Sequence, residues 1–169
     1  MKSSQYDLDS LLKKAKHTHS SNTVFLKKLK DVKPKDLDKT VKHFHSKVFE
    51  TIDCLQCAGC CRTISPIILN EDIDRIAKYV DLPTRSFIET YLYKDQENDF
   101  VFKQTPCPFL SEDNTCKIYE KRPKACYTYP HTDRNRFHQL LNLTLKNSLV
   151  CPAVFLIIEN LKKHYSSLL

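Results

Sequence analysis

Glycine is nearly missing from this sequence of 169 residues, in which Gly59 is the single glycine. Phosphate-binding loops of the Walker and dinucleotide types need several glycines, so the sequence argues against a nucleotide site of either type. It also contains no Gly-x-Ser-x-Gly elbow and no His-Glu-x-x-His motif. The best-marked signatures of serine hydrolases and zinc proteases are therefore absent as well.

Long hydrophobic runs are missing too. The longest uninterrupted apolar run is Ala153–Ile158, whereas crossing a bilayer takes about 18–20 apolar residues. Lys2 is followed by Ser-Ser-Gln and an acidic stretch, which does not resemble a secretory signal. We therefore expect a cytoplasmic protein without a membrane span. A composition of 41% hydrophobic and 28% charged residues is typical of a folded chain, and the length suits one domain, residues 1–169.

Basic residues are concentrated near the start of the chain. Residues 1–52 hold twelve Lys and six acidic residues, whereas the remaining residues hold fifteen basic and fourteen acidic ones. Clustered lysines can neutralise phosphates. Here, however, every cation is Lys, acidic residues are interspersed, and no aromatic and glycine residues alternate with them. This pattern favours a solvated helix surface over nucleic-acid contact. Binding of a protein partner to this segment remains an alternative.

Hydrophobic periodicity predicts helices over residues 5–52, because apolar residues recur there at steps of three and four. The stripes are Leu8, Leu11, Leu12 and Ala15; Val24, Phe25 and Leu29; and Leu37, Val41, Phe44 and Val48. Pro34 suits the first turn of the third helix, and Asp36 and Asp38 suit its positive end.

The rest of the chain predicts shorter elements. Residues 53–63 lack periodicity and predict a loop. A helix is expected from an N-cap at Asn70 to about Val80, and another after Pro83, with Phe87, Ile88 and Tyr91 on its inner face. Phe100–Lys103 predicts a strand, and 109–110 with 116–119 predict a hairpin around a polar turn. The chain is expected to be irregular after Pro123 to about residue 133, with helices over 135–147 and 152–164.

These elements predict a mainly α fold with a small β hairpin, in which helices pack around a cysteine-rich metal-binding loop region. Three segments are expected within the domain. Residues 1–52 form a basic helical N-terminal segment, 53–152 a cysteine-cluster core that binds metal, and 153–169 a C-terminal helix.

Cysteine is the residue type that most strongly indicates chemistry. The eight cysteines are Cys54, Cys57, Cys60, Cys61, Cys107, Cys116, Cys126 and Cys151. Disulfides are disfavoured in a chain without an export signal, and isolated core cysteines would not cluster in this way. The first three repeat the Cys-x-x-Cys spacing, which lets two thiolates converge on one ion. We therefore predict all eight cysteines as metal ligands.

Details around these cysteines suggest roles for their neighbours. Gly59 precedes the third cysteine and is expected to take a positive φ there. Cys61 follows Cys60 directly, and since adjacent side chains usually diverge, one of the two is expected to belong to another site or to be a free thiol. Cys107 and Cys151 each precede a proline, as the last cysteine of bacterial ferredoxin runs does.

Charged residues near the later cysteines are further candidates. Arg122 and Lys124 lie between Cys116 and Cys126, where their charges can balance thiolates, unless they are only surface residues. Among the histidines, His131 is the one candidate ligand or proton carrier, because it lies close to Cys126 in the sequence.

Five ordered blocks resemble a known family. They are Cys54-x-x-Cys57-x-x-Cys60-Cys61, Cys107-Pro108-Phe109-Leu110, Cys116-Lys117-Ile118-Tyr119, Arg122-Pro123-x-x-Cys126-x-x-Tyr129-Pro130 and Cys151-Pro152. Together they resemble the YkgJ-type cysteine-cluster family, whose members are described as zinc- or iron-chelating. Bacterial flagellin lysine N-methylases share this cysteine domain, and the resemblance suggests an iron–sulfur cluster. This chain is much shorter than those methylases and has Tyr127 where many members have Arg. The resemblance therefore carries metal binding, rather than the methylase activity, to the eight cysteines.

Three functions follow as hypotheses. The first is a protein whose thiolates hold an iron–sulfur cluster, for example of the 4Fe–4S type, or zinc, since both favour thiolate ligands. The second is a metal-dependent enzyme of redox or methyl-group transfer, with Cys61 as a reactive thiol. The third is an interaction module with structural zinc, in which the Lys-rich segment binds an acidic partner.

Overall fold

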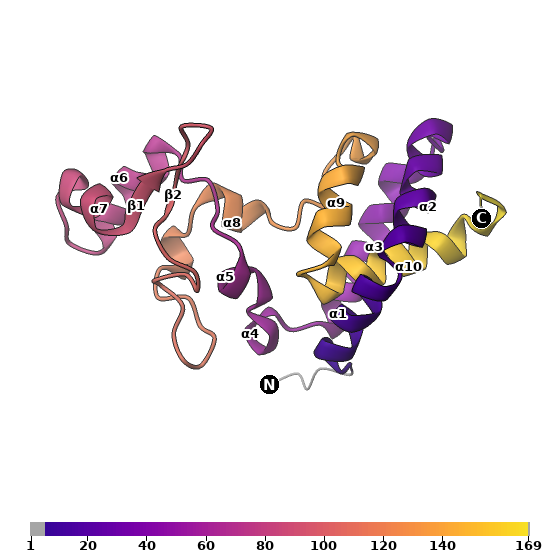
Figure 1. The fold of residues 1–169 in the computed structure, drawn as a ribbon, viewed down its shortest axis with the longest axis horizontal. Helices are drawn as coiled ribbons and strands as arrows, with labels where there is room; N and C mark the ends of the chain where they lie inside the picture. Colours follow the sequence, from indigo (N-terminus) through magenta and orange to yellow (C-terminus); the bar gives the residue numbers. More distant parts are fainter. Residues whose placement is uncertain (1–5, 169) are drawn as a thin grey trace. The chain divides into compact units, whose positions relative to one another are not determined.

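The computed structural model describes residues 6–168. Residues 1–5 and 169 lie outside the described residues, so the predicted helical start at residue 5 falls there. The described chain is mainly α-helical with one two-stranded sheet, which confirms the predicted fold class. It divides into two compact units (Figure 1). The helical unit comprises the chain up to Cys54 and from Pro130 onward, and the cysteine unit comprises residues 55–129.

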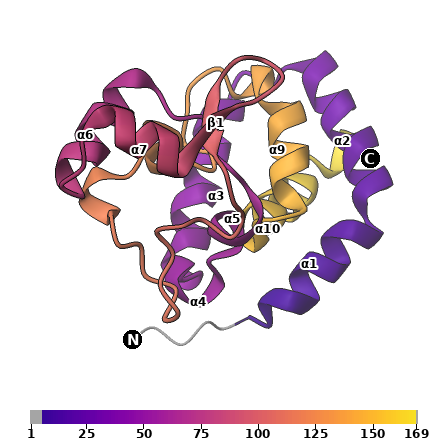
Figure 2. The ribbon, with the colours of Figure 1, turned by 60° about the vertical axis from the view of Figure 1, so that its left-hand side comes forward.

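The helical unit is built from five longer helices. They are α1 (Leu8–His17), α2 (His19–Val32), α3 (Leu37–Thr51), α9 (Leu141–Ser148) and α10 (Pro152–His164), with the 3-10 turns η2 (Phe137–Gln139) and η3 (Ser166–Leu168). Helix α10 packs against α3, α1 and α9 (Figure 2). The helices predicted over 5–52 and 152–164 are thus confirmed.

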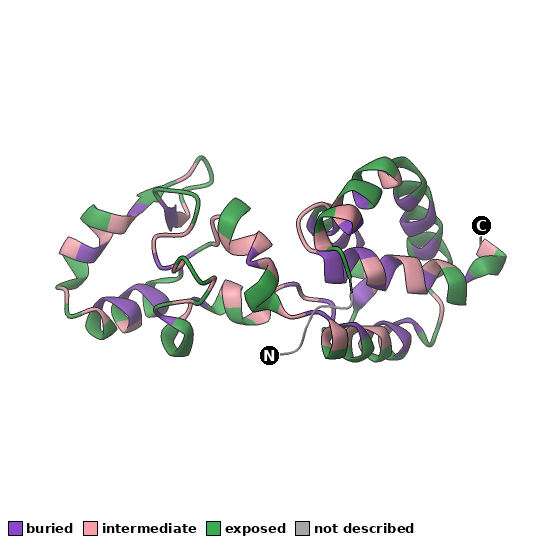
Figure 3. Ribbon diagram, turned by 90° about the horizontal axis from the view of Figure 1, so that it is seen from below, coloured by how far each residue is buried: buried purple, intermediate pink, exposed green. Residues whose placement is uncertain are grey.

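Most of the predicted stripes point into this unit (Figure 3). Phe25 and Leu29 of α2 are fully buried with Val41 of α3 and with Ile157 of α10. Val24, in contrast, is 56% exposed, because its neighbours Phe25 and Leu26 define the buried face and the next position on a helix points elsewhere. Burial of these side chains is the main stabilising contribution to this unit.

Two predicted helix starts in this unit are wrong. Pro34 precedes α3, whose N-cap is Asp36, and its carbonyl accepts the N–H of Leu37 at 3.1 Å. The helix predicted over 135–147 begins at Leu141. The reason is that the backbone N–H groups of Arg136 and Phe137 donate to the carboxylate of Asp38, at 2.7 and 2.8 Å, which holds the chain in a turn before the helix.

The cysteine unit contains short helices around a small sheet. They are α5 (Gly59–Thr63), α6 (Asn70–Tyr79), α7 (Thr84–Tyr91), the 3-10 turn η1 (Tyr119–Lys121) and α8 (Lys124–Thr128), and α4 (Cys54–Cys57) begins at the boundary with the helical unit. Strand β1 (Leu92–Lys94) pairs antiparallel with β2 (Phe100–Phe102), with Leu92 opposite Phe102. A separate core of Ile73, Ile76, Phe87, Phe102, Phe109 and Ile118 lies beneath.

The hairpin lies at a different place from the one predicted. It is formed by β1, which the sequence did not reveal, and β2, whereas residues 109–119 make a single antiparallel bridge between Leu110 and Cys116. The predicted polar turn is present there, and Asn114 takes its left-handed conformation with φ 66°. Asparagine tolerates this region better than other non-glycine residues, which explains a tight turn without glycine.

Two segments predicted to be irregular contain helices. Residues 53–63 include α4 and α5, and residues 123–133 include α8. Helices of four or five residues are too short to show a hydrophobic period, so no pattern in the sequence predicts them. The helix after residue 69 is confirmed, with Leu69 rather than Asn70 as the N-cap, and α7 begins after Pro83 with Phe87 buried, as predicted. In the described part of the chain, no helix has both the length and the apolar character needed to cross a membrane.

Candidate metal centre

The first cysteine segment turns sharply before α5. The left-handed residue of this turn is Ala58, with φ 45° and ψ 18°, and not Gly59, so the predicted positive φ at Gly59 is wrong. Gly59 is instead the first residue of α5, which carries Cys60 and Cys61. The Sγ atoms of these two cysteines lie 4.0 Å apart. The short helix therefore keeps adjacent thiols close rather than sending them to different regions.

A backbone hydrogen bond joins the first cysteine segment to the second. The N–H of Cys107 donates to the carbonyl oxygen of Cys61 at 2.8 Å. The N–H of Leu110 donates to the carbonyl oxygen of Cys107 at 3.0 Å, and Leu110 pairs with Cys116 in the antiparallel bridge. Three cysteines from distant parts of the sequence are thus linked through their own main chains.

Apolar side chains two positions after Cys107 and Cys116 anchor these loops. Phe109 is buried among three aromatic rings, with centroid distances of 6.3 Å to Phe87, 5.0 Å to Tyr91 and 5.7 Å to Phe102. Ile118 is 2% exposed in the same core. The sequence predicts Phe109 as part of a hairpin and of a cysteine motif, not as an aromatic anchor. Its position in an apolar pair beside a cysteine was the one available sign of this role.

Asp72 holds the segment that carries Cys126. Its buried carboxylate accepts the backbone N–H of Lys124, the first residue of α8, at 3.1 Å, and that of Leu69 at 3.2 Å. Arg75 forms an ion pair with Asp72 and also donates to the carbonyl of Arg122 at 3.1 Å. No local pattern indicated that Asp72 reaches a segment 52 residues away.

The thiols of Cys61, Cys107, Cys116 and Cys126 are close enough to influence one another's ionisation. Burial raises the pKa of Cys107 to about 11 and that of Cys126 to about 12, and it also raises the pKa of Cys116. A charge on Cys61 raises all three pKa values further. None of the four is part of a disulfide. We call these four residues the thiol cluster.

Cys61 differs from the other three members. The interaction of its thiol with Cys60 lowers the pKa of Cys61 to about 7, against the effect of burial. Cys61 is therefore the member of the cluster that ionises first near neutral pH.

Arg122 lies beside the thiol cluster in an aromatic stack. Its guanidinium carbon is 3.9 Å from the ring centroid of Tyr119 and 5.0 Å from that of Tyr127, and Nη1 donates to the carbonyl of Tyr119 at 2.7 Å. Both rings are exposed, Tyr127 to 71%. The charge of Arg122 acts to lower the pKa of Cys116 and Cys126, although burial outweighs it.

The predicted ligands are divided between the two units. Cys57, Cys60, Cys61, Cys107, Cys116 and Cys126 belong to the cysteine unit, whereas Cys54, Cys151 and the candidate His131 belong to the helical unit. Within residues 6–168, no three histidine, cysteine or carboxylate side chains already have the arrangement of a metal site. The thiol cluster lies within the cysteine unit, and the sulfur of Cys60, in the same unit, is 4.0 Å from that of Cys61, whose role the sequence left open.

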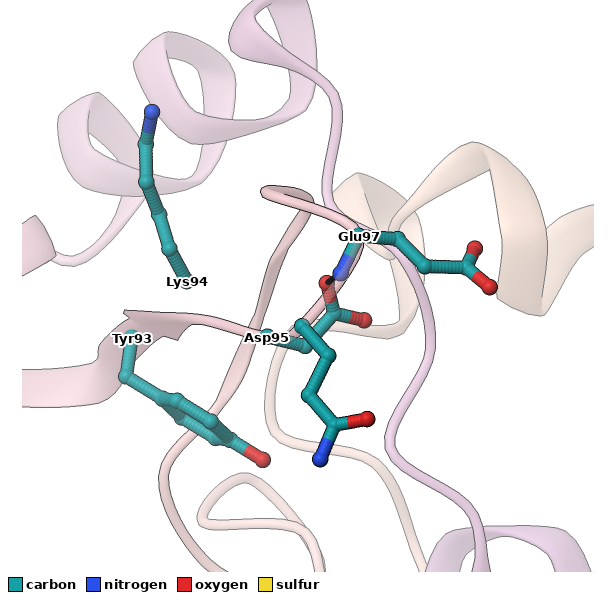
Figure 4. Close-up of a pocket in the computed structure, with 5 residues that line it drawn as sticks. Tyr93, Lys94, Asp95 and Glu97 are labelled. Atoms are coloured by element: carbon teal, nitrogen blue, oxygen red, sulfur yellow. Dashed lines mark hydrogen bonds between the residues drawn. The ribbon is translucent and has the colours of Figure 1, made fainter.

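A hollow beside the turn between β1 and β2 is a weaker candidate (Figure 4). It is lined by residues 93–97. The carboxylate of Asp95 accepts the backbone N–H groups of Glu97 at 2.9 Å and Asp99 at 3.0 Å. Because this carboxylate already stabilises the turn, the hollow offers no convergent set of ligand groups.

Comparison with known proteins supports the cysteine region as the site. Residues 53–148 match a family model, CxxCxxCC, described as "Putative zinc- or iron-chelating domain". No match was found among curated proteins or among solved structures.

Proposed function

The chain belongs to the CxxCxxCC family, and from this premise we propose that its thiol cluster binds an iron–sulfur cluster or a zinc ion. The observation that carries the proposal is the main-chain pairing that joins the segments of Cys61, Cys107 and Cys116, through the 2.8 Å hydrogen bond from Cys107 to Cys61 and the bridge between Leu110 and Cys116. The mutual effect of these thiols and Cys126 on their pKa values agrees with it. Four thiols free of disulfides supply the ligand number that a tetrahedral zinc site or a four-cysteine iron–sulfur cluster requires.

The donor set fits both groups. Thiolate sulfur is a soft ligand that zinc and iron–sulfur clusters prefer, whereas hard cations such as magnesium prefer oxygen ligands. The Cys-x-x-Cys-x-x-Cys spacing and the Cys-Pro pairs favour the iron–sulfur alternative. Binding of the metal ion or cluster would draw the four thiol side chains into the coordination geometry of the bound site. The assignment of Cys54, Cys57, Cys60 and Cys151 as ligands stays a prediction.

Surrounding residues support retention of such a centre. Phe109 and Ile118 fix the two loops that carry Cys107 and Cys116, and Asp72 fixes the start of α8, which carries Cys126. Four thiolates around a divalent ion leave two negative charges, and the guanidinium of Arg122 lies where it offsets them.

A second candidate function rests on the Cys60–Cys61 pair. A thiol whose pKa is lowered to about 7 is partly thiolate at neutral pH, and its neighbour's sulfur is 4.0 Å away. Such a thiol is a nucleophile. This favours an enzyme of redox or group transfer as the alternative to a purely metal-holding protein, in a reducing compartment such as the cytoplasm.

Anaerobic purification followed by metal analysis and visible spectroscopy tests the proposal. Brown protein with iron and inorganic sulfide supports the iron–sulfur form, and colourless protein with one tightly held zinc supports the zinc form. Serine variants of Cys61, Cys107, Cys116 and Cys126 should each lose most of the metal. Native protein without tightly held iron or zinc would contradict the proposal. Cys151→Ser, measured in parallel, reports whether the cysteine in the helical unit is a ligand.

A further inference from the structure

A group of lysines in the helical unit carries the net charge of the protein. Residues 13–35 contain eight Lys and one acidic residue, Asp31, and so hold a formal charge of +7, equal to that of the whole chain. The remaining residues hold nineteen basic and nineteen acidic side chains. The eight are Lys13, Lys14, Lys16, Lys27, Lys28, Lys30, Lys33 and Lys35, which we call the lysine surface.

Every member of the lysine surface is exposed. The opposite sides of α1 and α2 are buried. Leu11 and Ala15 pack with Phe155 of α10, and Phe25 and Leu29 lie in the main core of the helical unit. Six of the eight lysines lie on α1 and α2, which are consecutive helices separated by the single residue Thr18 (Figure 2). Lys33 and Lys35 follow the end of α2.

The lysine charges are not neutralised by the protein. Apart from Lys28, none of the eight makes an ion pair or a side-chain hydrogen bond within residues 6–168. Lys162 of α10 shows the contrast, since its Nζ lies 2.8 Å from Glu159 and donates to Asn22 at 3.1 Å. Uncompensated like charges on one surface produce a field that attracts polyanions.

The mixed charges of residues 1–52 as a whole favour a solvated surface, but residues 13–35 hold eight exposed lysines and one acidic residue. From this narrower segment we propose that the lysine surface binds the phosphate backbone of double-stranded DNA without sequence preference. Lysine is a point charge suited to phosphate, and the absence of arginine from residues 13–35 removes the usual bidentate reader of guanine. Helices of 10 and 14 residues extend about 15 and 21 Å, so each is shorter than one turn of B-form DNA, about 34 Å.

Other polyanions fit this surface less well. An amphipathic helix binds a membrane through an apolar face, but the apolar faces of α1 and α2 are already buried. Single-stranded nucleic acid is held largely by aromatic stacking, and Phe25, the aromatic residue within 13–35, is fully buried.

The experiment measures binding of the full-length protein to a labelled DNA duplex of arbitrary sequence, about 20 base pairs long, across a salt series. The test variant carries Lys13→Gln, Lys16→Gln, Lys27→Gln and Lys30→Gln. The matched control carries Lys47→Gln, Lys78→Gln, Lys146→Gln and Lys163→Gln, four exposed lysines elsewhere. Both variants lose the same charge, and circular dichroism confirms that both are folded.

For the unmodified protein we expect the logarithm of the affinity to fall with log salt with a slope of about −5, a loss of about 1,000-fold between 50 and 200 mM salt. The test variant should bind at least about tenfold more weakly at the lower salt, with a slope shallower by about 3. The control should stay within about threefold of the unmodified protein.

Several results would overturn the inference. No binding at low salt would do so, as would equal weakening in both variants, which would show an effect of net charge alone. Equal or tighter binding to single-stranded DNA, to RNA or to phosphatidylserine vesicles would assign the surface to another polyanion. None of these outcomes depends on which metal the cysteines hold, so the inference stands or falls separately from the proposed function.

Discussion

The main-chain N–H of Cys107 donates a 2.8 Å hydrogen bond to the carbonyl oxygen of Cys61. This bond joins segments separated by more than forty residues of sequence, and it brings the second of two adjacent cysteines, rather than the first, toward the later cysteine loops. The predictions below follow from the side chains that maintain this arrangement.

Asp72→Ala is expected to destabilise the cysteine unit by about 2–4 kcal/mol, because it leaves the N–H groups of Leu69 and Lys124 without their carboxylate acceptor and removes the ion-pair partner of Arg75. Urea unfolding measures this change, and metal content should fall with it. Asp74→Ala removes an exposed carboxylate from the same helix and should cost less than about 1 kcal/mol. Equal effects of the two variants would contradict the role given to Asp72.

Phe109→Ala is expected to lower the free energy of unfolding by about 3–5 kcal/mol, because it removes a ring buried among Phe87, Tyr91 and Phe102. The loop of Cys107 loses its anchor at the same time, so the metal should dissociate faster in a competition assay with a chelator. Tyr93→Ala, at a position 48% exposed, serves as the control and should change neither quantity appreciably. Retention of metal by the Phe109 variant at the normal rate would show that the anchor is dispensable.

Arg122→Gln is expected to weaken metal binding about three- to tenfold, since it removes a positive charge beside Cys116 and Cys126 that solvent partly screens. Arg122→Lys keeps the charge but not the stacked plane and should give an intermediate affinity. Arg85→Gln removes an equally charged but exposed side chain paired with Glu89 and is the control. A chelator competition titration compares the four proteins, and no difference between the Arg122 and Arg85 variants would refute the electrostatic role.

Zinc affinity should rise steeply with pH. The raised pKa values of Cys107, Cys116 and Cys126 keep these thiols protonated near neutral pH, so each must release one proton to become a ligand. Cys61 has a pKa of about 7 and is already partly ionised, so it releases on average only a fraction of a proton. Lowering the pH favours the protonated thiols and weakens binding. We expect the logarithm of the affinity to increase by about three to four per pH unit between about pH 6 and 8. A slope near zero would exclude ligation by these four thiols.

Removal of the metal by a chelator should affect the two units differently. Each unit has its own hydrophobic core. The proposed ligands all belong to the cysteine unit, so loss of the metal removes contacts from that unit and leaves the core of the helical unit intact. Hydrogen exchange should therefore increase in residues 55–129 well before it increases in α3 and α10. Simultaneous loss of protection in both units would show that the metal stabilises the chain as a whole.

The sequence predicted the parts of the fold that repeat a pattern. The stripes of α1, α2 and α3 and the continuous apolar residues of α10 predicted these four helices, because each buries a face at a helical period. Their grouping into one unit was not predicted. Helices of four or five residues, such as α5 and α8, are set by contacts with distant segments. The Asp72 bond to Lys124 is one such contact, and no local pattern encodes it.

The candidate site was predicted by residue type but not by grouping. The cysteine spacing indicated metal ligands, and the family match supports zinc or iron chelation. The cysteine spacing could not show that Cys61 interacts with Cys107, Cys116 and Cys126, because this grouping depends on pairing between segments far apart in the chain. Likewise, the turn before α5 places its left-handed residue at Ala58, although glycine is the residue type that normally occupies such positions.

The helical unit is assembled from both sides of the cysteine unit, with α1 to α3 before it and α9 and α10 after it in the chain. During translation, residues 55–129 leave the ribosome before α10, whose side chains complete the hydrophobic core to which α3 also contributes. If the thiol cluster suffices to bind metal, as proposed above, we therefore expect residues 55–129 to be able to bind it before α10 completes the core of the helical unit.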